Sequence, residues 1–360
     1  MPTACRKARF PLMALGLLAL LAALWGGLIR LGWALPFIRS PLSAVHGPLM
    51  VCGFLGTLIG VERAVALGTL WPYAAPLLTA VGGLALLAGL PAAPLITLGS
   101  LGLVAIFAVI ARRQFALATV TMALGALLWL VGNGFWLVGS PLPEVVPWWS
   151  GFLVLTIAGE RLELSRLLRL SWQHYLVFLL AVSILLAGLL SVPMVFVHGG
   201  HATGMGMVAL AGWLLRYDIA RRTVRQTGLT RFIAVCLLSG YVWLGVGGVL
   251  TWRFAEVLAG PYYDARLHTV FVGFVFAMIF GHAPIIIPAI LGRTTAPYHA
   301  AFYVPLVLLH ASLLLRIVGD MVGWWPGRLW GGFFNAMAVL LFLLTLARVL
   351  RALGATSSSP

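Results

Sequence analysis

The feature that most constrains this chain is a succession of apolar runs, each about twenty residues long, separated by short polar breaks. A bilayer core of roughly 30 Å requires about twenty apolar residues for each helical crossing. Hydrophobic residues make up 62% of the 360 positions and charged residues only 9%, which leaves no room for a separate soluble domain. Runs between glycine, proline and charged breaks predict about twelve spans, near residues 11–34, 43–67, 72–91, 94–112, 115–138, 146–168, 174–191, 198–219, 230–252, 264–291, 299–318 and 328–350. We therefore expect residues 1–360 to form a single polytopic, all-α integral membrane domain.

The net charge of +15 is distributed in a way that argues for membrane topology and against nucleic-acid binding. The basic residues stand at the ends of the predicted spans and not in one tail or on one amphipathic face. Even-numbered spans finish in arginines, on the side that also carries Arg6, Lys7 and Arg9, whereas the other side has few, such as Arg39 and Arg253. The positive-inside rule then predicts that both termini are cytoplasmic. The first apolar run is predicted to be a retained helix and not a cleaved signal peptide.

Three even-numbered spans share a sequence pattern. They read GFLGTLIGVER from Gly53, GFLVLTIAGER from Gly151 and GFVFAMIFGHA from Gly273, and each places a polar group, Glu62, Glu160 or His282, eight residues after the Phe. Short matches also arise by chance in membrane helices, but a Glu-Arg pair inside a span is rare, and here it occurs twice at one offset. The pattern predicts three pseudo-repeated four-helix units, at about 11–112, 115–222 and 230–351.

Two of the eight histidines open spans that belong to this pattern. His46 precedes its Gly-Phe by seven residues and His268 by five, so the two imidazoles are expected at similar depth near the outer surface. This is the arrangement that a bis-histidine haem requires, with one axial ligand from each of two helices. The alternative is that each histidine is only a polar cap at the headgroup level. Arg266 and Asp264 are expected to pair with haem propionates, to orient the imidazole, or to be simple interface charges.

Other histidines suggest a second metal. His198 and His201 are three residues apart on one helical face, with Met205 and Met207 following, and imidazole with thioether is a ligand set that suits copper. A glycine-rich helix start with incidental methionines explains the same residues. His310, in the middle of a span, is either a further ligand or a packed histidine. The cysteines are isolated, with no CxxC or CxxCH, so any haem is expected to be non-covalent and of b type.

A second polar layer consists of Glu62, Arg63, Glu160, Arg161 and His282. His46 and Glu62 are sixteen residues apart, roughly 24 Å along a helix at about 1.5 Å per residue, which places this layer toward the cytoplasm. The layer is interpreted as a proton or anion path, or as buried ion pairs, each between neighbouring Glu and Arg, that join the repeats.

The run LHTVFVGFVFAMIFGHAP, with His268, Gly273 and Met278 at offsets of zero, five and ten, resembles the late histidine helix of the NnrS family. His46 followed by Gly53 and Phe54 resembles the early histidine helix of that family. The resemblance implies a twelve-helix protein of the bacterial inner membrane that contains haem and copper and is tied to nitric oxide and nitrosative stress. It covers most of the chain in topology and two helices in motif.

A more distant similarity is to the catalytic subunit of haem-copper oxidases and nitric-oxide reductases. That resemblance implies three four-helix arcs, with low-spin haem ligands on helices two and ten, where His46 and His268 stand. The second histidine of helix ten is here fourteen residues away, at His282, and the copper histidines of helices six and seven have no counterpart. A binuclear centre of the usual form is therefore not expected.

The leading expectation is a membrane haem protein, with copper as an option, that binds or turns over nitric oxide or a similar diatomic gas, receiving electrons from a quinol or a periplasmic donor. If it turns the gas over, it is a haem-dependent oxidoreductase. A cofactor-free secondary transporter would also show repeats and intramembrane Glu and Arg. An assembly partner of a respiratory complex is the third alternative.

Overall fold

The computed structural model describes residues 3–36, 42–292 and 296–356, without the side chains of residues 3–8, 196 and 353–356. Within these ranges all regular secondary structure is helical and no strand is present, which confirms the all-α prediction. The chain forms two compact units, Met1–Gly159 with Ala289–Arg293, and Glu160–Pro288 with Thr294–Pro360. Of the basic residues used to predict topology, Arg39 and Arg293 and the side chains of Arg6 and Lys7 lie outside the described residues.

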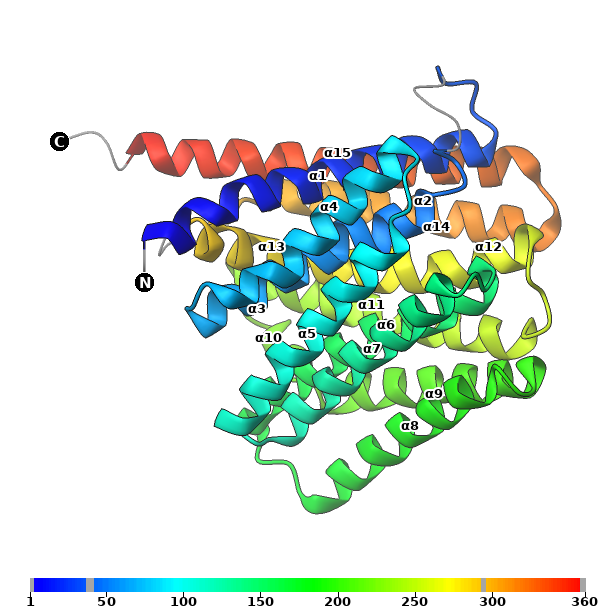
Figure 1. Cartoon of the computed structure of the whole chain (residues 1–360), viewed down its shortest axis with the longest axis horizontal. Coiled ribbons are helices and arrows are strands. Elements are labelled where there is room, and N and C mark those ends of the chain that lie inside the picture. Colours follow the sequence, from blue (N-terminus) through cyan, green and yellow to red (C-terminus); the bar gives the residue numbers. More distant parts are fainter. Residues whose placement is uncertain (1–2, 37–41, 293–295, 357–360) are drawn as a thin grey trace. The chain divides into compact units, whose positions relative to one another are not determined.

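The first unit contains most of the N-terminal half of the chain (Figure 1). Its helices are α1 (Thr3–Leu31), α2 (His46–Pro48), the π-helix η1 (Leu49–Gly56), α3 (Thr57–Leu67), η2 (Trp71–Tyr73), α4 (Ala74–Ala88), α5 (Ala93–Arg113), α6 (Leu117–Leu137) and most of α7 (Leu142–Leu164). Segments α2, η1 and α3 follow one another without a break and together form one membrane-length helix. Gly68 ends this helix in the left-handed region, with φ of 71°, a backbone conformation that favours glycine.

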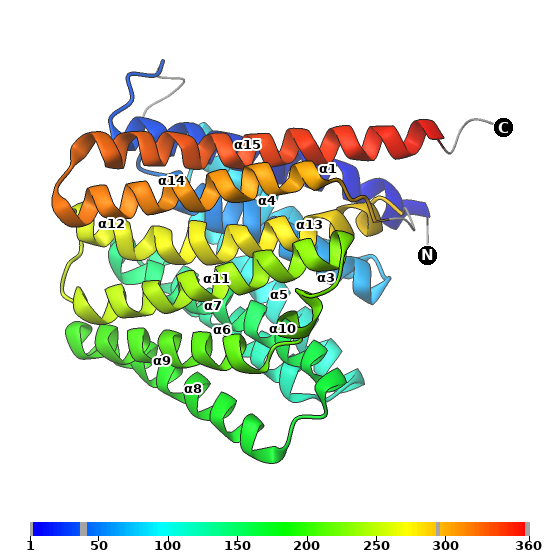
Figure 2. The same ribbon diagram turned by 180° about the vertical axis from the view of Figure 1, so that it is seen from behind.

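The second unit contains the remaining helices. They are η3 (Ser165–Leu168), α8 (Trp172–Ser191), α9 (Phe196–Tyr217), α10 (Ala220–Thr223), α11 (Gly228–Arg253), α12 (Gly260–His268), the π-helix η4 (Thr269–Phe276), α13 (Ala277–Ile290), η5 (Ala300–Phe302), α14 (Tyr303–Val322) and α15 (Trp325–Thr356). Figure 2 shows α14 and α15 lying side by side, joined by a short turn. Segments α12, η4 and α13 again form one continuous helix.

Eleven helices in the described part of the chain are long and apolar enough to cross a membrane. Each matches one of the twelve predicted spans, so the multi-pass membrane architecture is confirmed. Helix α9, predicted at 198–219, forms a 22-residue helix at that position and is not among the eleven because its hydropathy is lower. His198, His201 and five glycines lower its hydropathy. A helix with these polar side chains is more favourable in contact with other helices than in contact with lipid.

Helix α9 packs closely against its neighbours through glycines. Figure 2 shows α8, α9 and α11 side by side. A Cβ atom added to Gly204 would lie 2.5 Å from the Gly248 carbonyl oxygen and 2.5 Å from the Trp252 backbone nitrogen on α11, and one added to Gly199 would lie 2.6 Å from the Val192 backbone nitrogen. Small residues at a helix crossing let the two backbones approach, which is a main source of helix association in membranes.

We expect Gly204→Ala to lower the free energy of unfolding by about 1–3 kcal/mol, because its methyl group would collide with backbone atoms that cannot rotate away. Gly212→Ala is the matched control on the same helix, since a Cβ at Gly212 meets nothing within 4 Å and alanine is the better helix former. Thermal unfolding in detergent, followed with a thiol-reactive dye that labels the buried Cys52 and Cys236 on opening, measures both. Equal melting temperatures for the two variants would contradict the packing account.

Two π-helices of the same length occupy corresponding positions in the predicted repeats. Gly53 and Phe54 are the fifth and sixth residues of η1, and Gly273 and Phe274 are the fifth and sixth residues of η4. The third copy of the pattern, in α7, is α-helical throughout. A π-helical stretch within an α-helix is uncommon and is found frequently at functional sites. The shared local geometry supports the interpretation of these two segments as copies of one repeat. The division of the chain into three units stays a prediction.

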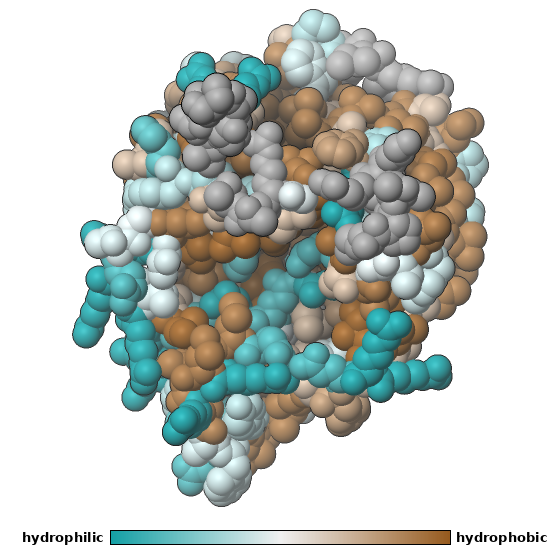
Figure 3. Space-filling model, turned by 90° about the vertical axis from the view of Figure 1, so that its left-hand side faces the viewer, coloured by the Kyte–Doolittle hydropathy of each residue, from teal (hydrophilic) through white to brown (hydrophobic). Residues whose placement is uncertain are grey.

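Exposed arginines stand at the ends of several helices. Hydrophilic side chains gather on the face drawn in Figure 3, the left-hand side of Figure 1, where α9 and α15 end. The exposed arginines that follow or terminate membrane-length helices include Arg112, Arg113, Arg166, Arg169, Arg221, Arg222, Arg225, Arg348 and Arg351. Large apolar side chains are exposed along the helices themselves, among them Leu127, Leu180 and Leu314, which is the pattern of lipid contact.

Candidate functional site

His46 lies at the start of the second membrane-length helix, in the first unit, three residues before η1. Its Nδ1 atom is 2.6 Å from the carbonyl oxygen of Ala23 on α1. The ring fits against Gly27, where a Cβ atom would lie 2.8 Å from Cε1 of His46. A neutral imidazole that donates from Nδ1 to a carbonyl carries its lone pair on Nε2, so this contact selects the tautomer that ligates metals through Nε2.

His268 lies at the end of α12, in the second unit, immediately before η4. Its Nδ1 atom is 2.8 Å from the carbonyl oxygen of Asp264 and 3.3 Å from the carboxylate oxygen Oδ1 of the same residue. His46 and His268 therefore share a tautomer, a half-buried position and a π-helix that follows. A carboxylate beside the ring is a common arrangement behind metal-ligating histidines.

Asp264 is the centre of a group of charged side chains in the second unit. Arg316 on α14 donates from Nε to Oδ2 at 2.8 Å and from Nη2 to Oδ1 at 2.9 Å, so the two side chains form a bidentate pair. Arg328 on α15 lies 3.8 Å from Asp264 and 3.0 Å from Asp320, although the latter pair lacks hydrogen-bond alignment. Asp264 links α12 to α14 and α15 through these contacts. It is therefore not the simple interface charge that was one of the alternatives from the sequence.

Arg266 lies against the loop between α11 and α12. Its side chain is 5% exposed, and Nη1 donates to the carbonyl oxygens of Phe254 and Ala255 at 2.9 and 3.3 Å. The guanidinium also stacks over the Tyr263 ring at 4.9 Å. These contacts hold the loop between α11 and α12.

His198 and His201 do lie together on α9, with ring centroids 6.4 Å apart. His201 also faces the Trp252 ring at 6.2 Å, whereas Met205 is 54% exposed and Met207 is buried. The two methionines therefore point to different environments. Among the described residues, no three His, Cys, Asp or Glu side chains form a group able to hold a metal ion. The structure thus gathers two of the proposed copper ligands, and not a complete set.

His310 is hydrogen-bonded at both ring nitrogens. Nδ1 accepts a hydrogen bond from the Trp243 indole at 2.9 Å, and Nε2 is 2.9 Å from the Ser239 hydroxyl. If the indole donates to Nδ1, the Nε2–H donates to the serine. This histidine links α14 to α11, and it would have to break one of these bonds to bind a metal.

The polar layer of the first unit contains the ion pair of Glu62 and Arg63. Arg63 Nη2 lies 3.5 Å from the carboxylate of its neighbour Glu62, and the two side chains are 14% and 29% exposed. The Arg63 guanidinium also stands over the Phe107 ring at 5.7 Å. The pairing of adjacent Glu and Arg that the sequence predicted is confirmed at this copy of the repeat.

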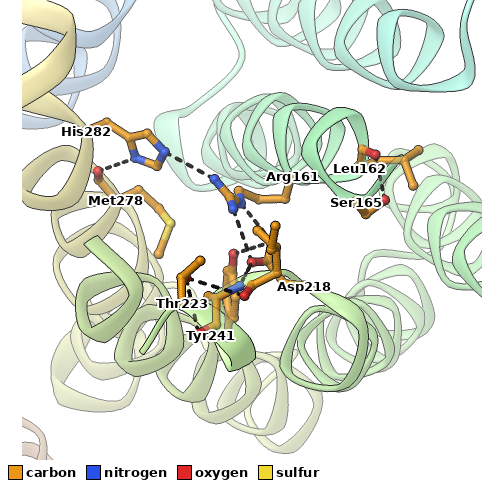
Figure 4. A network of polar contacts seen from close by, with 10 residues as sticks. Arg161, Leu162, Ser165, Asp218, Thr223, Tyr241, Met278 and His282 are labelled. Carbon is orange, nitrogen blue, oxygen red and sulfur yellow. Dashed lines mark hydrogen bonds and ion pairs between the residues drawn. The ribbon is translucent and has the colours of Figure 1, made fainter. Parts of the chain in front are cut away.

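The polar layer of the second unit is a buried network around Asp218, the residue that caps the C-terminal end of α9 (Figure 4). Arg161 on α7 donates from Nε and Nη2 to the two carboxylate oxygens of Asp218 at 2.7 and 3.1 Å. The Tyr241 hydroxyl on α11 and the backbone N–H of Ala220 donate to the same carboxylate at 3.1 and 2.7 Å. Arg161 and Asp218 are 3% and 0% exposed, so the charges compensate each other inside the protein.

The same network reaches α13 through His282. Arg161 Nη1 lies 3.5 Å from Nε2 of His282, whose Nδ1 is 2.7 Å from the Met278 carbonyl oxygen. Figure 4 shows the imidazole between Met278 and the guanidinium. With Nδ1 as donor, Nε2 accepts from Arg161, and the ring is neutral. Residues from α7, α9, α11 and α13 therefore meet in one set of hydrogen bonds.

The sequence did not predict three residues of these networks, Asp218, Tyr241 and Arg316. The scarcity of acidic residues is a signal that bears on the two charged ones. The chain has only 8 acidic residues against 23 basic ones. Because a charge inside a membrane span needs a partner, each aspartate in or beside a span predicts an arginine contact. The hydroxyl of Tyr241 carries no comparable signal.

The comparisons with known proteins identify a family and no activity. No curated protein matches the sequence. A family model described as a domain of unknown function, DUF8744, matches residues 9–351, which cover all or most of every membrane-length helix described above. The chain belongs to the DUF8744 family.

Proposed function

We propose that this protein is a multi-pass haem protein of the bacterial cytoplasmic membrane, with both termini cytoplasmic, in which His46 and His268 are iron ligands. The iron would bind nitric oxide or a similar diatomic gas. The observation that carries the proposal is the shared geometry of the two histidines. Each is half-buried, each directs Nδ1 at a backbone carbonyl, and each precedes an eight-residue π-helix.

The donor set fits a non-covalent haem. Neutral imidazoles with Nδ1 held by a carbonyl are the usual axial ligands of haem iron. Gly27 leaves space for the His46 ring that any other residue would fill. Cys52 and Cys236 are buried and isolated from any CxxCH motif, so covalent attachment is not available. Arg266 uses Nη1 for two backbone carbonyls, so it would contact a haem propionate through Nε or Nη2.

Each residue of the candidate site has a role that follows from its contacts. When bound, the iron would supply the open or exchangeable coordination position that a diatomic gas needs. The Ala23 carbonyl orients His46, and Asp264 orients His268. Arg316 holds Asp264 in place through two hydrogen bonds. The surrounding bilayer concentrates small apolar gases around the protein.

The test is an absorption spectrum of protein purified in detergent from cells supplied with a haem precursor. We expect a Soret band, a pyridine haemochrome of b type, and at least a tenfold loss of bound haem in both His46→Ala and His268→Ala. The haem-to-protein ratio distinguishes one iron that takes both ligands from two irons that take one each. Addition of nitric oxide to the reduced protein is expected to shift the Soret band.

His299→Asn is the matched control. His299 accepts a hydrogen bond from the Ala301 N–H at the start of η5, a cap that asparagine can also form. This variant should keep its full haem content. A folded wild-type protein that is colourless and free of metal would overturn the proposal, as would haem loss in the control equal to that in the two histidine variants.

One observation favours the competing proposal of a cofactor-free transporter. The Arg161–Asp218 pair is fully buried, bridges several helices and touches a neutral histidine. Intramembrane ionisable networks of this kind mark proton or ion pathways in transporters. A colourless protein that carries out proton-coupled uptake in vesicles, and loses it in His282→Gln, would establish that alternative.

A further inference from the structure

The second unit carries a dense group of exposed arginines where α9 ends and α11 begins, on the hydrophilic face drawn in Figure 3. These side chains, which we call the arginine ridge, are Arg216, Arg221, Arg222, Arg225 and Arg231. Asp218 is the only acidic residue in this stretch, and it is buried and paired with Arg161. Among the residues that the structure describes, no member of the ridge forms an ion pair, whereas the exposed Arg166 pairs with Glu163 at 2.8 Å. The ridge therefore presents positive charges that no described carboxylate compensates.

The backbone that carries the ridge is ordered by hydrogen bonds. Asp218 accepts a hydrogen bond from the Ala220 N–H at 2.7 Å and so fixes the start of α10. Arg221 donates from Nη1 to the carbonyl oxygen of Arg216 at 3.0 Å, and the Arg216 guanidinium lies over the Tyr217 ring at 5.3 Å. A ligand that binds here meets an arrangement that is already in place, which lowers the entropic cost of binding.

The level of the ridge relative to the bilayer is marked by a tryptophan. Trp172, the first residue of α8, is 70% exposed, and exposed tryptophans at helix ends gather at the headgroup level of membranes. The start of α8 packs against the end of α9, because the Trp213 indole donates to the His174 carbonyl oxygen at 2.8 Å and the His174 and Tyr217 rings are 4.5 Å apart. Helix α11, which is of membrane-spanning length, begins at Gly228. The ridge therefore lies where lipid headgroups surround the protein.

We propose that the arginine ridge binds the phosphate groups of anionic phospholipids in preference to zwitterionic ones. A guanidinium donates two parallel hydrogen bonds to a phosphate, and a cluster of about four to eight basic residues beside a membrane helix is typical of anionic-lipid binding. A zwitterionic headgroup carries its own cation, so it does not compensate the charge of the ridge. The headgroup level favours a lipid as the source of the phosphate over an anion dissolved in water. The proposal is independent of haem binding, since neither His46 nor His268 takes part.

The test measures lipid binding to the delipidated protein in detergent by native mass spectrometry, with phosphatidylglycerol as the anionic probe and phosphatidylcholine as the zwitterionic one. The double variant is Arg222→Gln with Arg225→Gln, because neither side chain makes a hydrogen bond, ion pair or ring contact in the described part of the chain. We expect it to bind phosphatidylglycerol at least about fivefold more weakly than the wild type does, with phosphatidylcholine binding unchanged. The matched control is Arg112→Gln with Arg113→Gln, which removes the same charge from the exposed end of α5 and should change either affinity by less than about twofold.

Inorganic phosphate at the concentration of the lipid, compared with sodium chloride at the same ionic strength, separates a lipid site from a site for a dissolved anion. Weaker phosphatidylglycerol binding in the ridge variant alone, with no displacement by phosphate, supports the proposal. Displacement by phosphate overturns it, and so does equal weakening in the two double variants, which would show that net charge attracts the lipid. Where the ridge variant does not fold, Arg225→Gln alone replaces it, with an expected weakening of at least about twofold, and an unchanged affinity overturns the proposal.

Discussion

Asp218→Asn is expected to lower the free energy of unfolding by about 3–5 kcal/mol, the usual cost of leaving one charge of a buried pair without its partner. Asparagine keeps the size of the side chain, but it removes the negative charge that Arg161 contacts through Nε and Nη2. The guanidinium cannot lose its proton and is 3% exposed, so neither neutralisation nor water can compensate it. The measurement is thermal and chemical unfolding in bicelles, followed by labelling of the buried cysteines.

Two controls separate this effect from a general intolerance of substitution. The double variant Arg161→Met with Asp218→Leu removes both charges and should be more stable than Asp218→Asn alone. Glu163→Gln breaks the exposed Glu163–Arg166 pair, whose side chains are 37% and 47% exposed, and should change stability by less than about 1 kcal/mol. An Asp218→Asn protein as stable as the wild type would show that Arg161 is compensated elsewhere.

Arg316→Leu is expected to lower the free energy of unfolding by about 3 kcal/mol. This is the lower end of the range for breaking a buried ion pair, because the side chains of Arg316 and Asp264 are 10% and 14% exposed. The substitution leaves the Asp264 carboxylate with the distant Arg328 at 3.8 Å as its remaining arginine. It also releases the carboxylate that stands beside Nδ1 of His268. We therefore expect a lower unfolding temperature and, in the haem-loaded protein, a changed iron reduction potential.

Arg316→Lys tests whether charge or geometry matters at this pair. Lysine keeps the positive charge but cannot donate two parallel hydrogen bonds to one carboxylate. Its stability should fall between those of the wild type and Arg316→Leu. If Arg316→Lys and Arg316→Leu are equally unstable, the bidentate geometry accounts for the whole contribution. If Arg316→Leu unfolds like the wild type, Asp264 does not depend on this arginine.

The helical framework could be predicted from the sequence because the bilayer imposes it. Apolar runs of fixed length, such as 230–252, coincide with helices whose ends differ by a few residues. The departure is α9, where His198 and His201 lower the hydropathy of a helix that is otherwise of spanning length. Its place in the fold depends on glycine contacts with α8 and α11, which are long-range and leave no periodic signal.

The positions of the candidate histidines were predictable, and their surroundings were not. The interval from each histidine to its Gly-Phe pair located His46 and His268 on corresponding helices. The π-helices that follow them depend on hydrogen-bond patterns that residue types do not encode in any simple way. The pairing of Arg161 with Asp218 could not be predicted from the sequence, because the two residues are 57 positions apart in the chain. Glu62 and Arg63, by contrast, are adjacent.

The two π-helices change how this protein has to be compared with its relatives. A residue in a π-helix turns the chain through a smaller angle than a residue in an α-helix, so the phase of a helical wheel is lost across residues 49–56 and 269–276. Residues before and after these stretches that share a face on a wheel drawn at 3.6 residues per turn do not share one in the molecule. Alignments of the family that score amphipathic faces should therefore treat each of these spans as two independent helical segments.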